Sequence, residues 1–398
     1  MTDFDPMSPA FLSDPHAALR RVRDASAAFR HEKTWPGPVV SLLRYAEVRA
    51  GYRDFKTFSN YTPEEARELE LADGISLLGE DPPLHTHLRG AVNKVFTAHA
   101  IAALEPQVQE ACDHIFDDVL GTDEIDMVED LAARLTVTMI ARLVGVPEAD
   151  YPLVRDWTRR QSAINGASLW LTGEDDSRIE EFMRITREAN DEMQAYFGER
   201  VDERLDRPRD DILSLLVQSG LSRQQAISFA KLLVMAGNET TTNLINNSVK
   251  LLIDHPEQDR ILRADPNLVP SALEEVLRFG PPILYSVRTA ACDTELGGVK
   301  IREGEAVVLW AGSGNRDERV FEDPDRFDVR RAPKGVLSFG FGIHACLGSP
   351  LARLEGRVFL STLLRRTRAV ERTRGEMTPV PTPIFNGVRH QHLRLVAA

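Results

Sequence analysis

The chain has 398 residues, 42% of them hydrophobic and 27% charged, which is enough apolar sequence to bury a large core. Its 48 basic and 61 acidic residues give a formal net charge of −13, which argues against a nucleic-acid partner. Cys112, Cys292 and Cys346 lie far apart, without zinc-site spacing or a disulfide framework, as in proteins of a reducing cytosol. The chain has no apolar run long enough for a membrane span and no signal-peptide pattern at its start, so we expect neither.

The hydrophobic periodicity is mainly helical, and no low-complexity linker or internal repeat divides the chain. We therefore expect one domain over residues 1–398. The early elements are expected to be a helix over 15–24, a strand over 39–43 and a helix over 45–51. The expected later helices cover 98–120, 126–145, 148–164, 177–205, 208–219, 222–254 and 268–279.

Strand-like patterns follow the break at residues 280–282, over 294–301 and 306–309. The sequence thus predicts a helical core over about 82–280, with β-rich parts over about 36–60 and 285–398. The segment 63–80 is acidic and irregular, and we expect a mobile flap there.

The first group of candidate site residues begins at Asp81, which suits a helix N-cap because two prolines follow it. His85 and Arg89 then lie four residues apart, on one face of that helix. Two donors on one face suit a carboxylate or phosphate ligand. A solvated basic face would have the same pattern.

The second group lies in the long helix that Ser222 and Gln225 open with a capping box. The centre of this helix reads A-G-N-E-T-T-T from Ala236, and glycine and β-branched residues are poor helix formers. The hydroxyl of Thr240 can bond the carbonyl of Ala236 and bend or loosen the helix, which would open a notch. The alternative is a polar turn that faces another helix.

Cys346 lies in a glycine-rich loop directly before a helix start. Ser349 suits the N-cap of that helix, and the positive end of the helix favours thiolate over thiol. Gly348 and two earlier glycines leave room for backbone to lie flat against a planar partner. Such a thiolate is either a nucleophile or a metal ligand.

The loop reads Phe339-Gly340-x-Gly342-x-His344-x-Cys346-x-Gly348, which resembles the haem-binding loop of the cytochromes P450. The A-G-x-E-T-T stretch and an E-x-x-R pair at Glu275 and Arg278 precede it in the family's order. The resemblance runs from about residue 12 to the C-terminus. It implies the P450 fold, a mainly α triangular prism with small β-sheets. The chain resembles the soluble bacterial members, so we expect a cytoplasmic protein.

The resemblance implies haem b with Cys346 as the metal ligand, and O2 as co-substrate. The cofactor-binding positions that it implies are His85, Arg89, Ala236, Gly237, Arg288, Phe339, His344, Cys346 and Gly348. Glu239 and Thr240 match the family's acid–alcohol pair, whose proposed work is to deliver protons to bound dioxygen. Glu275, Arg278 and Arg331 match residues that hold the cysteine loop.

The implied reaction is monooxygenation, in which thiolate donation favours O–O cleavage. No flavin or nicotinamide fingerprint occurs in the chain, so we expect a [2Fe-2S] or similar ferredoxin with an NAD(P)H-dependent reductase, and a monomeric enzyme. A basic patch around the cysteine loop is expected to attract this acidic donor. Its expected members are Arg89, Lys94, Arg330, Arg331, Lys334, Arg353 and Arg357.

The substrate is expected to be a small or medium hydrophobic molecule, because the candidate pocket segments are mostly apolar. The expected pocket residues are Leu78, Leu233, Ala236, Ile283, Leu284 and Phe385. Hydroxylation and O-demethylation share one C–H abstraction step, and both stay open. The alternatives are a peroxide-driven haem-thiolate enzyme and a non-catalytic haem protein that senses or carries a gas.

Overall fold

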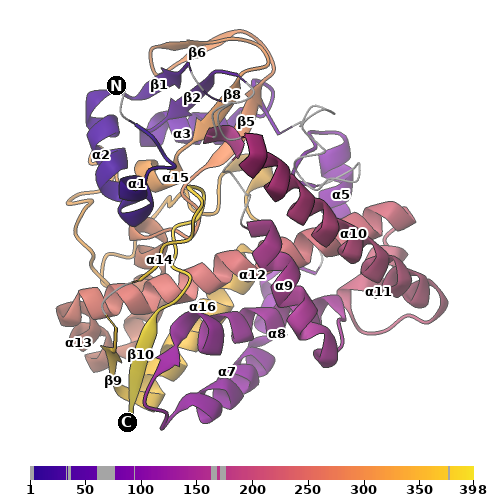
Figure 1. The fold of residues 1–398 in the computed structure, drawn as a ribbon, viewed down its shortest axis with the longest axis vertical. Coiled ribbons are helices and arrows are strands. Elements are labelled where there is room, and N and C mark those ends of the chain that lie inside the picture. The colour runs from indigo at the N-terminus through magenta and orange to yellow at the C-terminus, as the bar shows by residue number, and fades with distance from the viewer. Residues whose placement is uncertain are drawn as a thin grey trace.

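The longest helix, α12 (Arg223–Asp254), runs through the middle of the molecule (Figure 1). Its 32 residues correspond to a length of about 48 Å. The predicted capping box is confirmed, since the Ser222 hydroxyl accepts from the N–H of Gln225 and the Gln225 side chain accepts from the N–H of Ser222. The computed structural model describes residues 4–32, 34, 37–60, 77–93, 95–162, 168–170, 176–374 and 377–398.

Four long helices pack directly on α12 and bury most of it. These are α8 (Ala133–Val144), α9 (Tyr151–Ser162), α10 (Asp176–Asp206) and α16 (Ser349–Arg366). The other helices are α1 (Pro9–Ser13), α2 (Pro15–Ala25), α3 (Tyr45–Arg53), α5 (Leu84–Val92), α6 (Ala98–Ala102), α7 (Glu105–Val119), α11 (Ile212–Gln218), α13 (Pro256–Ala264), α14 (Val269–Phe279) and α15 (Ala311–Gly314).

A five-stranded sheet lies with α1, α2 and α3 at the top of Figure 1. Its order is β1 (Ala28–His31), β2 (Val39–Leu42), β8 (Ala306–Leu309), β5 (Ser286–Ala290) and β3 (Phe58–Ser59). Only β2 and β8 are parallel, with Val40 opposite Val307, and both strands are largely buried. A second sheet near the C-terminus joins β4 (Ile125–Asp126), β10 (His392–Ala397) and β9 (Thr367–Arg372).

Three predicted elements differ from the structure. The strand expected over 294–301 is a hairpin of β6 (Thr294–Leu296) and β7 (Val299–Ile301), because Gly297 and Gly298 have φ values of +61° and +78° and turn the chain. The helix expected over 98–120 is broken into α6 and α7, and Pro106 lies in the first turn of α7.

The helix expected over 126–145 begins one residue later, because Asp126 pairs with β10. Its first part is a π-helical stretch (Met127–Ala132) that leads into α8. The flap expected over 63–80 lies mostly outside the described residues. Among the residues that are described, no helix combines the length and the apolar character needed to cross a bilayer.

An aromatic cluster joins the sheet to the turn at residues 168–170, between α9 and α10. Trp170 packs on Tyr285 and Trp310, and its Nε1 donates a hydrogen bond to the Tyr285 hydroxyl, 2.9 Å away. His31 packs against Trp170 from the other side, with ring centroids 5.0 Å apart. This cluster fixes the described part of the α9–α10 connection against the sheet.

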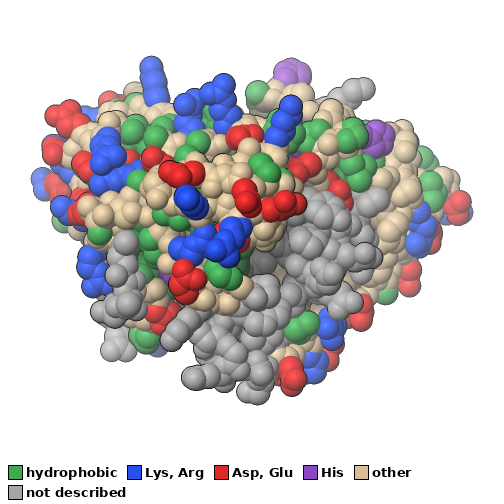
Figure 2. Space-filling view, turned by 90° about the horizontal axis from the view of Figure 1, so that it is seen from above, with side chains coloured by type: hydrophobic (Ala, Val, Ile, Leu, Met, Phe, Trp, Pro, Cys, Tyr) green, Lys and Arg blue, Asp and Glu red, His purple; other side chains and the backbone are tan. Residues whose placement is uncertain are grey.

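Cys112 and Cys292, the two cysteines outside the glycine-rich loop, differ in exposure. Cys112 is buried on α7, and burial raises its pKa, whereas Cys292 is exposed just after β5. On the face in Figure 2, acidic and basic side chains are interspersed. Acidic and basic side chains also form ion pairs between α7 and α16: Arg357–Glu105, Arg365–Asp113 and Arg366–Asp117.

The stability of the fold is expected to fall between pH 7 and pH 5 because of His31. Burial in the aromatic cluster lowers its pKa to about 4, so the unfolded chain binds a proton first as the pH falls. The loss expected by pH 5 is about 2 kcal/mol in the free energy of unfolding, measured in urea. In His31→Phe this part of the pH dependence should disappear. In His114→Gln, at an exposed histidine on α7, it should remain.

Candidate functional site

The loop that carries Cys346 is held by its own backbone. The Cys346 N–H donates to the carbonyl of Phe339, 2.8 Å away. Gly340 and Gly342 have φ values of +68° and +80°, and a Cβ at Gly342 would lie 2.8 Å from the carbonyl oxygen of Tyr52. Glycine is therefore required at 342, both for the turn and for the close approach of α3.

The helix after the loop begins differently from the prediction. Gly348, not Ser349, holds the N-cap position of α16, and no side chain caps the helix. The backbone N–H groups of Gly348 and Ser349 instead lie at hydrogen-bonding distance from the sulfur of Cys346. The helix start therefore donates to the sulfur, which stabilises a charged thiolate.

The Cys346 side chain is accessible although protein atoms surround it on most sides, as for a thiol in the wall of a hollow. Burial raises its pKa, and the two N–H groups, Arg89 and Arg353 oppose this increase. A bound cation would supply the missing compensation for the buried charge. In the described part of the chain, no three His, Cys, Asp or Glu side chains form a metal cluster, so a metal at Cys346 would need other ligands from a cofactor.

The rings of His85 on α5 and His344 of the loop are in contact, with centroids 4.1 Å apart and planes inclined at 51°. The Nε2 atom of each ring is buried and has no hydrogen-bond partner. Burial, together with His85 and Arg288, lowers the pKa of His344 to about 4. The nearest acidic atom is Oδ1 of Asp81, 3.6 Å from Nε2 of His344, which exceeds hydrogen-bonding distance.

Asp81 does not cap α5, which was the prediction. Its carboxylate accepts from the Ser59 hydroxyl and from the N–H of Asn60, and so ties the end of β3 to the start of α5. The cap position belongs to Pro83, which has no side-chain cap bond. The prediction failed because Asp81 serves a neighbour more than twenty residues away in sequence.

Arg89 on α5 and Arg288 on β5 lie beside the cysteine loop. Arg89 donates from Nη2 to the carbonyl of Ala345, 2.7 Å away, so it holds the residue before the cysteine. Arg288 donates to the carbonyl of Val287 and lies 5.4 Å from the ring centre of Tyr52. Burial lowers the pKa of both arginines. Within the described chain, neither arginine has an ion-pair partner.

These contacts test whether the residues fit a haem. Two buried histidine nitrogens without partners and a buried Arg288 converge beside an accessible cysteine. Such donors are costly to leave unpaired, and carboxylate groups of a bound cofactor would satisfy them. Open space lies where a Cβ of Gly348 would be. The residues therefore fit a planar, dicarboxylate group with iron at Cys346.

The expected acid–alcohol pair lies at the centre of α12. The Thr240 hydroxyl donates to the carbonyl of Ala236, 2.7 Å away, as the sequence predicts. The helix continues without interruption through this turn, from Arg223 to Asp254. Ala236 is nevertheless exposed in the middle of a packed helix. A Cβ at Gly237 would lie 2.9 Å from Cδ1 of Ile140, so the glycine lets α8 approach closely.

Glu239 has a partner that sequence reasoning missed. Its carboxylate lies 3.4 Å from Nη1 of Arg155 on α9, and Arg155 also pairs with Glu129 at 2.7 Å. Burial raises the pKa of Glu239, and Arg155 opposes this. Glu129 is partly exposed, so the three groups lead from solvent to the centre of α12. Glu129, Arg155 and Glu239 lie in three separate helical segments, so no regular spacing in the sequence predicts that they meet.

The Glu275–Arg278 ion pair on α14 is fully buried, with 2.7 Å between Arg278 Nε and Glu275 Oε2. Arg331 joins it from the loop, with its Nε 3.1 Å from Oε1 of Glu275. Asn315 links this network to the cysteine loop, since its side chain accepts from the N–H of Leu337, 2.7 Å away. All three residues of the expected structural set are therefore in contact.

The expected pocket residues divide into two groups. Leu233 is buried on α12, three residues before the exposed Ala236. Ile283 and Phe385 lie opposite each other in an isolated β-bridge. Leu284 packs instead in the aromatic cluster behind β5, because neighbouring residues of an extended chain point to opposite sides. Leu78 is 56% exposed.

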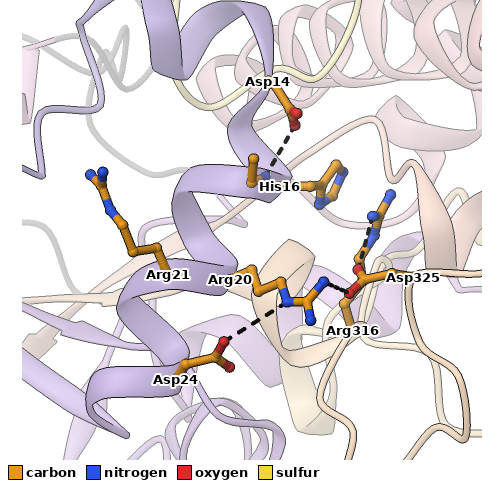
Figure 3. A pocket seen from close by; sticks show the side chains of 8 residues that line it. Asp14, His16, Arg20, Arg21, Asp24, Arg316 and Asp325 are labelled. Carbon is orange, nitrogen blue, oxygen red and sulfur yellow. Dashed lines mark hydrogen bonds and ion pairs between the residues drawn. The ribbon is translucent and has the colours of Figure 1, made fainter.

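Two charged clefts lie elsewhere, on α2. One of about 490 Å³ is drawn in Figure 3, where Asp325 bridges Arg20 and Arg316 at 2.9 and 3.3 Å. Its lining is Asp14, His16, Ala17, Arg20, Arg21, Asp24, Arg316 and Asp325. Its opposite charges neutralise one another, and no residue of the cysteine site lines it.

Known proteins resemble the chain over nearly its whole length. The family model described as "Cytochrome P450" matches residues 163–387. The putative cytochrome P450 YjiB of Bacillus subtilis is 35% identical, over 94% of this chain and 91% of that protein. The structure of CYP109E1 from Bacillus megaterium in complex with testosterone has a TM-score of 0.89 and 32% identity, covering 97% of this chain and 99% of that one.

P450BioI in complex with hexadec-9Z-enoic acid ligated acyl carrier protein also has a TM-score of 0.89, at 30% identity. It covers 97% of this chain and 99% of that one. The fold is thus shared with several solved proteins.

Removing one charge of the buried ion pair should destabilise the cysteine loop. Glu275→Gln leaves Arg278 buried without its carboxylate, which typically costs about 3–5 kcal/mol. We expect this loss in urea unfolding, together with faster release of bound haem. Glu371→Gln removes an exposed ion pair with Arg394 and serves as the control, with little expected change. Equal behaviour of the two variants would contradict the assigned role.

Proposed function

Because this chain belongs to the cytochrome P450 family and has the mainly α P450 fold, we propose that it binds haem b through Cys346 and oxygenates a hydrophobic substrate with dioxygen. The chain is a cytochrome P450 monooxygenase. The observation that carries the cofactor proposal is the accessible Cys346 thiol beside two buried, unpartnered histidine nitrogens. The proposed enzyme is one domain over residues 1–398 that acts as a monomer in the cytoplasm.

The cofactor would be held from three sides. Cys346 supplies the iron ligand, and the N–H groups of Gly348 and Ser349 keep its sulfur charged. His85, His344 and Arg288 would bind the propionates, and Arg89 would reach a propionate only by leaving the Ala345 carbonyl. The faces of the ring would meet Phe339 and Gly348 on one side and Ala236 and Gly237 on the other. When bound, haem supplies the activation of dioxygen and the transfer of one oxygen atom to a C–H bond.

Proton delivery is assigned to Glu239 and Thr240. Glu239 takes protons from the side of Glu129 and Arg155, which is open to solvent. Burial raises the pKa of Glu239, which favours its protonated form and suits a group that passes protons on. The Thr240 hydroxyl donates to the Ala236 carbonyl, so its oxygen can accept from a water, and that water would pass the proton on. Leu233 and the neighbouring apolar side chains exclude other water from the site.

The substrate is proposed to be a small or medium apolar molecule. Leu233, Ile283 and Phe385 present apolar surface, and two structural neighbours bind testosterone and a fatty acyl group. Leu78 and Ala236 complete the proposed pocket. Leu284 would shape it only indirectly, through Ile283. Hydroxylation and O-dealkylation begin with the same C–H bond cleavage, and the pocket allows both.

The proposed haem ligation is tested by the absorption spectrum of the ferrous carbonyl form. Wild type and Cys292→Ser should show the strongly red-shifted Soret band of thiolate ligation, and Cys346→Ser should lose it. A histidine-type spectrum, or no haem binding by wild type, would contradict the proposal. Turnover with peroxide alone would identify a peroxygenase. Inactivity with both peroxide and an NAD(P)H–ferredoxin system would point to a gas carrier.

Electrons are proposed to come from an acidic ferredoxin that binds near the cysteine loop. The basic surface there is smaller than the sequence indicates, because Arg353 and Arg357 are paired with Glu274 and Glu105. Arg331 and Arg89 are engaged internally as well, and Lys94 lies outside the described residues. Arg330 and Lys334 are exposed and, in the described structure, form no ion pair.

Charge reversal at both positions, Arg330→Glu with Lys334→Glu, should therefore slow electron transfer from the ferredoxin, most strongly at low salt. The measurement is the rate of haem reduction in stopped flow under carbon monoxide. Lys300→Glu with Arg302→Glu, at the β6–β7 hairpin, changes the net charge by the same amount and is the control. Equal rates in both proteins would place the docking surface elsewhere.

A further inference from the structure

Asn238, directly before the acid–alcohol pair, is fully buried and joins three helices. Its Nδ2 donates to the Thr158 hydroxyl on α9, 2.7 Å away. Its Oδ1 accepts from the Thr136 hydroxyl on α8 at 2.8 Å, and Thr242 lies within hydrogen-bonding distance of both. The carboxamide therefore uses its donor toward one helix and its acceptor toward another.

The helix α9 contacts the same turn of α12 a second time. Arg155 lies three residues before Thr158, so both side chains share one face of α9. Arg155 pairs with Glu239, and Thr158 accepts from Asn238. Two successive residues of α12 are thus held by one face of α9, the first by a neutral hydrogen bond and the second by an ion pair.

The Asn238–Thr158 hydrogen bond and the Arg155–Glu239 ion pair differ in length and in burial. The Arg155–Glu239 pair is long, at 3.4 Å, and Arg155 is shared with the partly exposed Glu129. The Asn238–Thr158 hydrogen bond is short and both side chains are buried, so breaking it would leave polar groups unsatisfied. The neutral contact therefore fixes the distance between the helices, and the ion pair depends on that distance.

The directions of the Glu239 and Thr240 side chains follow from the contact between Asn238 and α9. Successive helix residues point about 100° apart, so a fixed rotation at Asn238 turns Glu239 toward α9. The same rotation leaves Thr240 free to bond the Ala236 carbonyl and to face the exposed side of α12. A slip or rotation of α12 against α9 would move both groups together.

We propose that Asn238 is a positioning residue for proton delivery, which fixes α9 to α12 so that Glu239 and Thr240 keep their directions. This inference rests on the proposed function. The residue touches neither substrate nor cofactor and acts through the Thr158 hydroxyl. Aspartate cannot replace it, because the Thr158 hydroxyl already donates to backbone carbonyls of α9 and would meet a second acceptor.

The test uses the holoprotein in its ferrous carbonyl form, and the readout is the infrared C–O stretching band. This band responds to polar groups that face the bound gas, and it needs neither a substrate nor turnover. Asn238→Leu and Thr158→Val should each displace or split the band relative to wild type. Thr158→Ser keeps the hydroxyl and should retain the wild-type band. The double variant should shift the band no further than either single variant, because both remove one interaction.

Asn247→Leu is the matched control for the cost of losing a buried amide. Asn247 is buried on the same helix and donates to the carbonyls of Gly280 and Asn386, away from the acid–alcohol pair. It should lower the unfolding free energy as Asn238→Leu does, without moving the band. If Asn238→Leu does not fold, Thr158→Val decides the question alone.

An unmoved band in both Asn238→Leu and Thr158→Val, with stability lost, would overturn the inference and leave a merely structural role. A shift in Asn247→Leu as large as in Asn238→Leu would overturn it as well. The wild-type Soret band separates this result from failure of the proposed function. Without a thiolate-type spectrum the proposed function falls, and this inference falls with it.

Discussion

The cysteine site depends on the ion pair that Glu275 and Arg278 form inside the protein, where both side chains are wholly inaccessible. Burying two charges is costly, and their attraction compensates only when the remaining hydrogen-bonding groups are also satisfied. Here they are, since Arg278 donates to the carbonyls of Asn315, Pro324 and Arg326, and Glu275 accepts from the N–H of Asp328. One pair thus holds α14 and the chain before the cysteine loop in a single arrangement.

The site beside Cys346 contains buried polar groups that lack hydrogen-bond partners. Elsewhere in the described structure the acidic and basic side chains are largely paired, as between α7 and α16. Beside Cys346, however, His85 and His344 keep buried nitrogens without partners. Two such imidazole nitrogens and the buried Arg288, grouped beside one accessible thiol, suit an anionic ligand there.

The sequence predicted what depends on local pattern. The span and cap of α12, the Thr240–Ala236 hydrogen bond and the Glu275–Arg278 pair all follow from spacings of three or four residues. It failed where a distant segment competes, as when Asp81 serves the end of β3 and Asp126 pairs with β10. The Arg155–Glu239 pair and the Asn238–Thr158 bond were missed for the same reason, because tertiary contacts between helices have no fixed spacing in the sequence.

The contrast among the three thiols has a practical use. Cys112 is enclosed on α7, and Cys346 would be committed to iron, which leaves Cys292 exposed at the end of β5. A maleimide dye or spin label added to the native holoprotein should therefore attach at one defined place on the sheet. Distances from that label to a second, introduced label on α9 would report how this helix moves when ligands bind, without any cysteine having to be removed first.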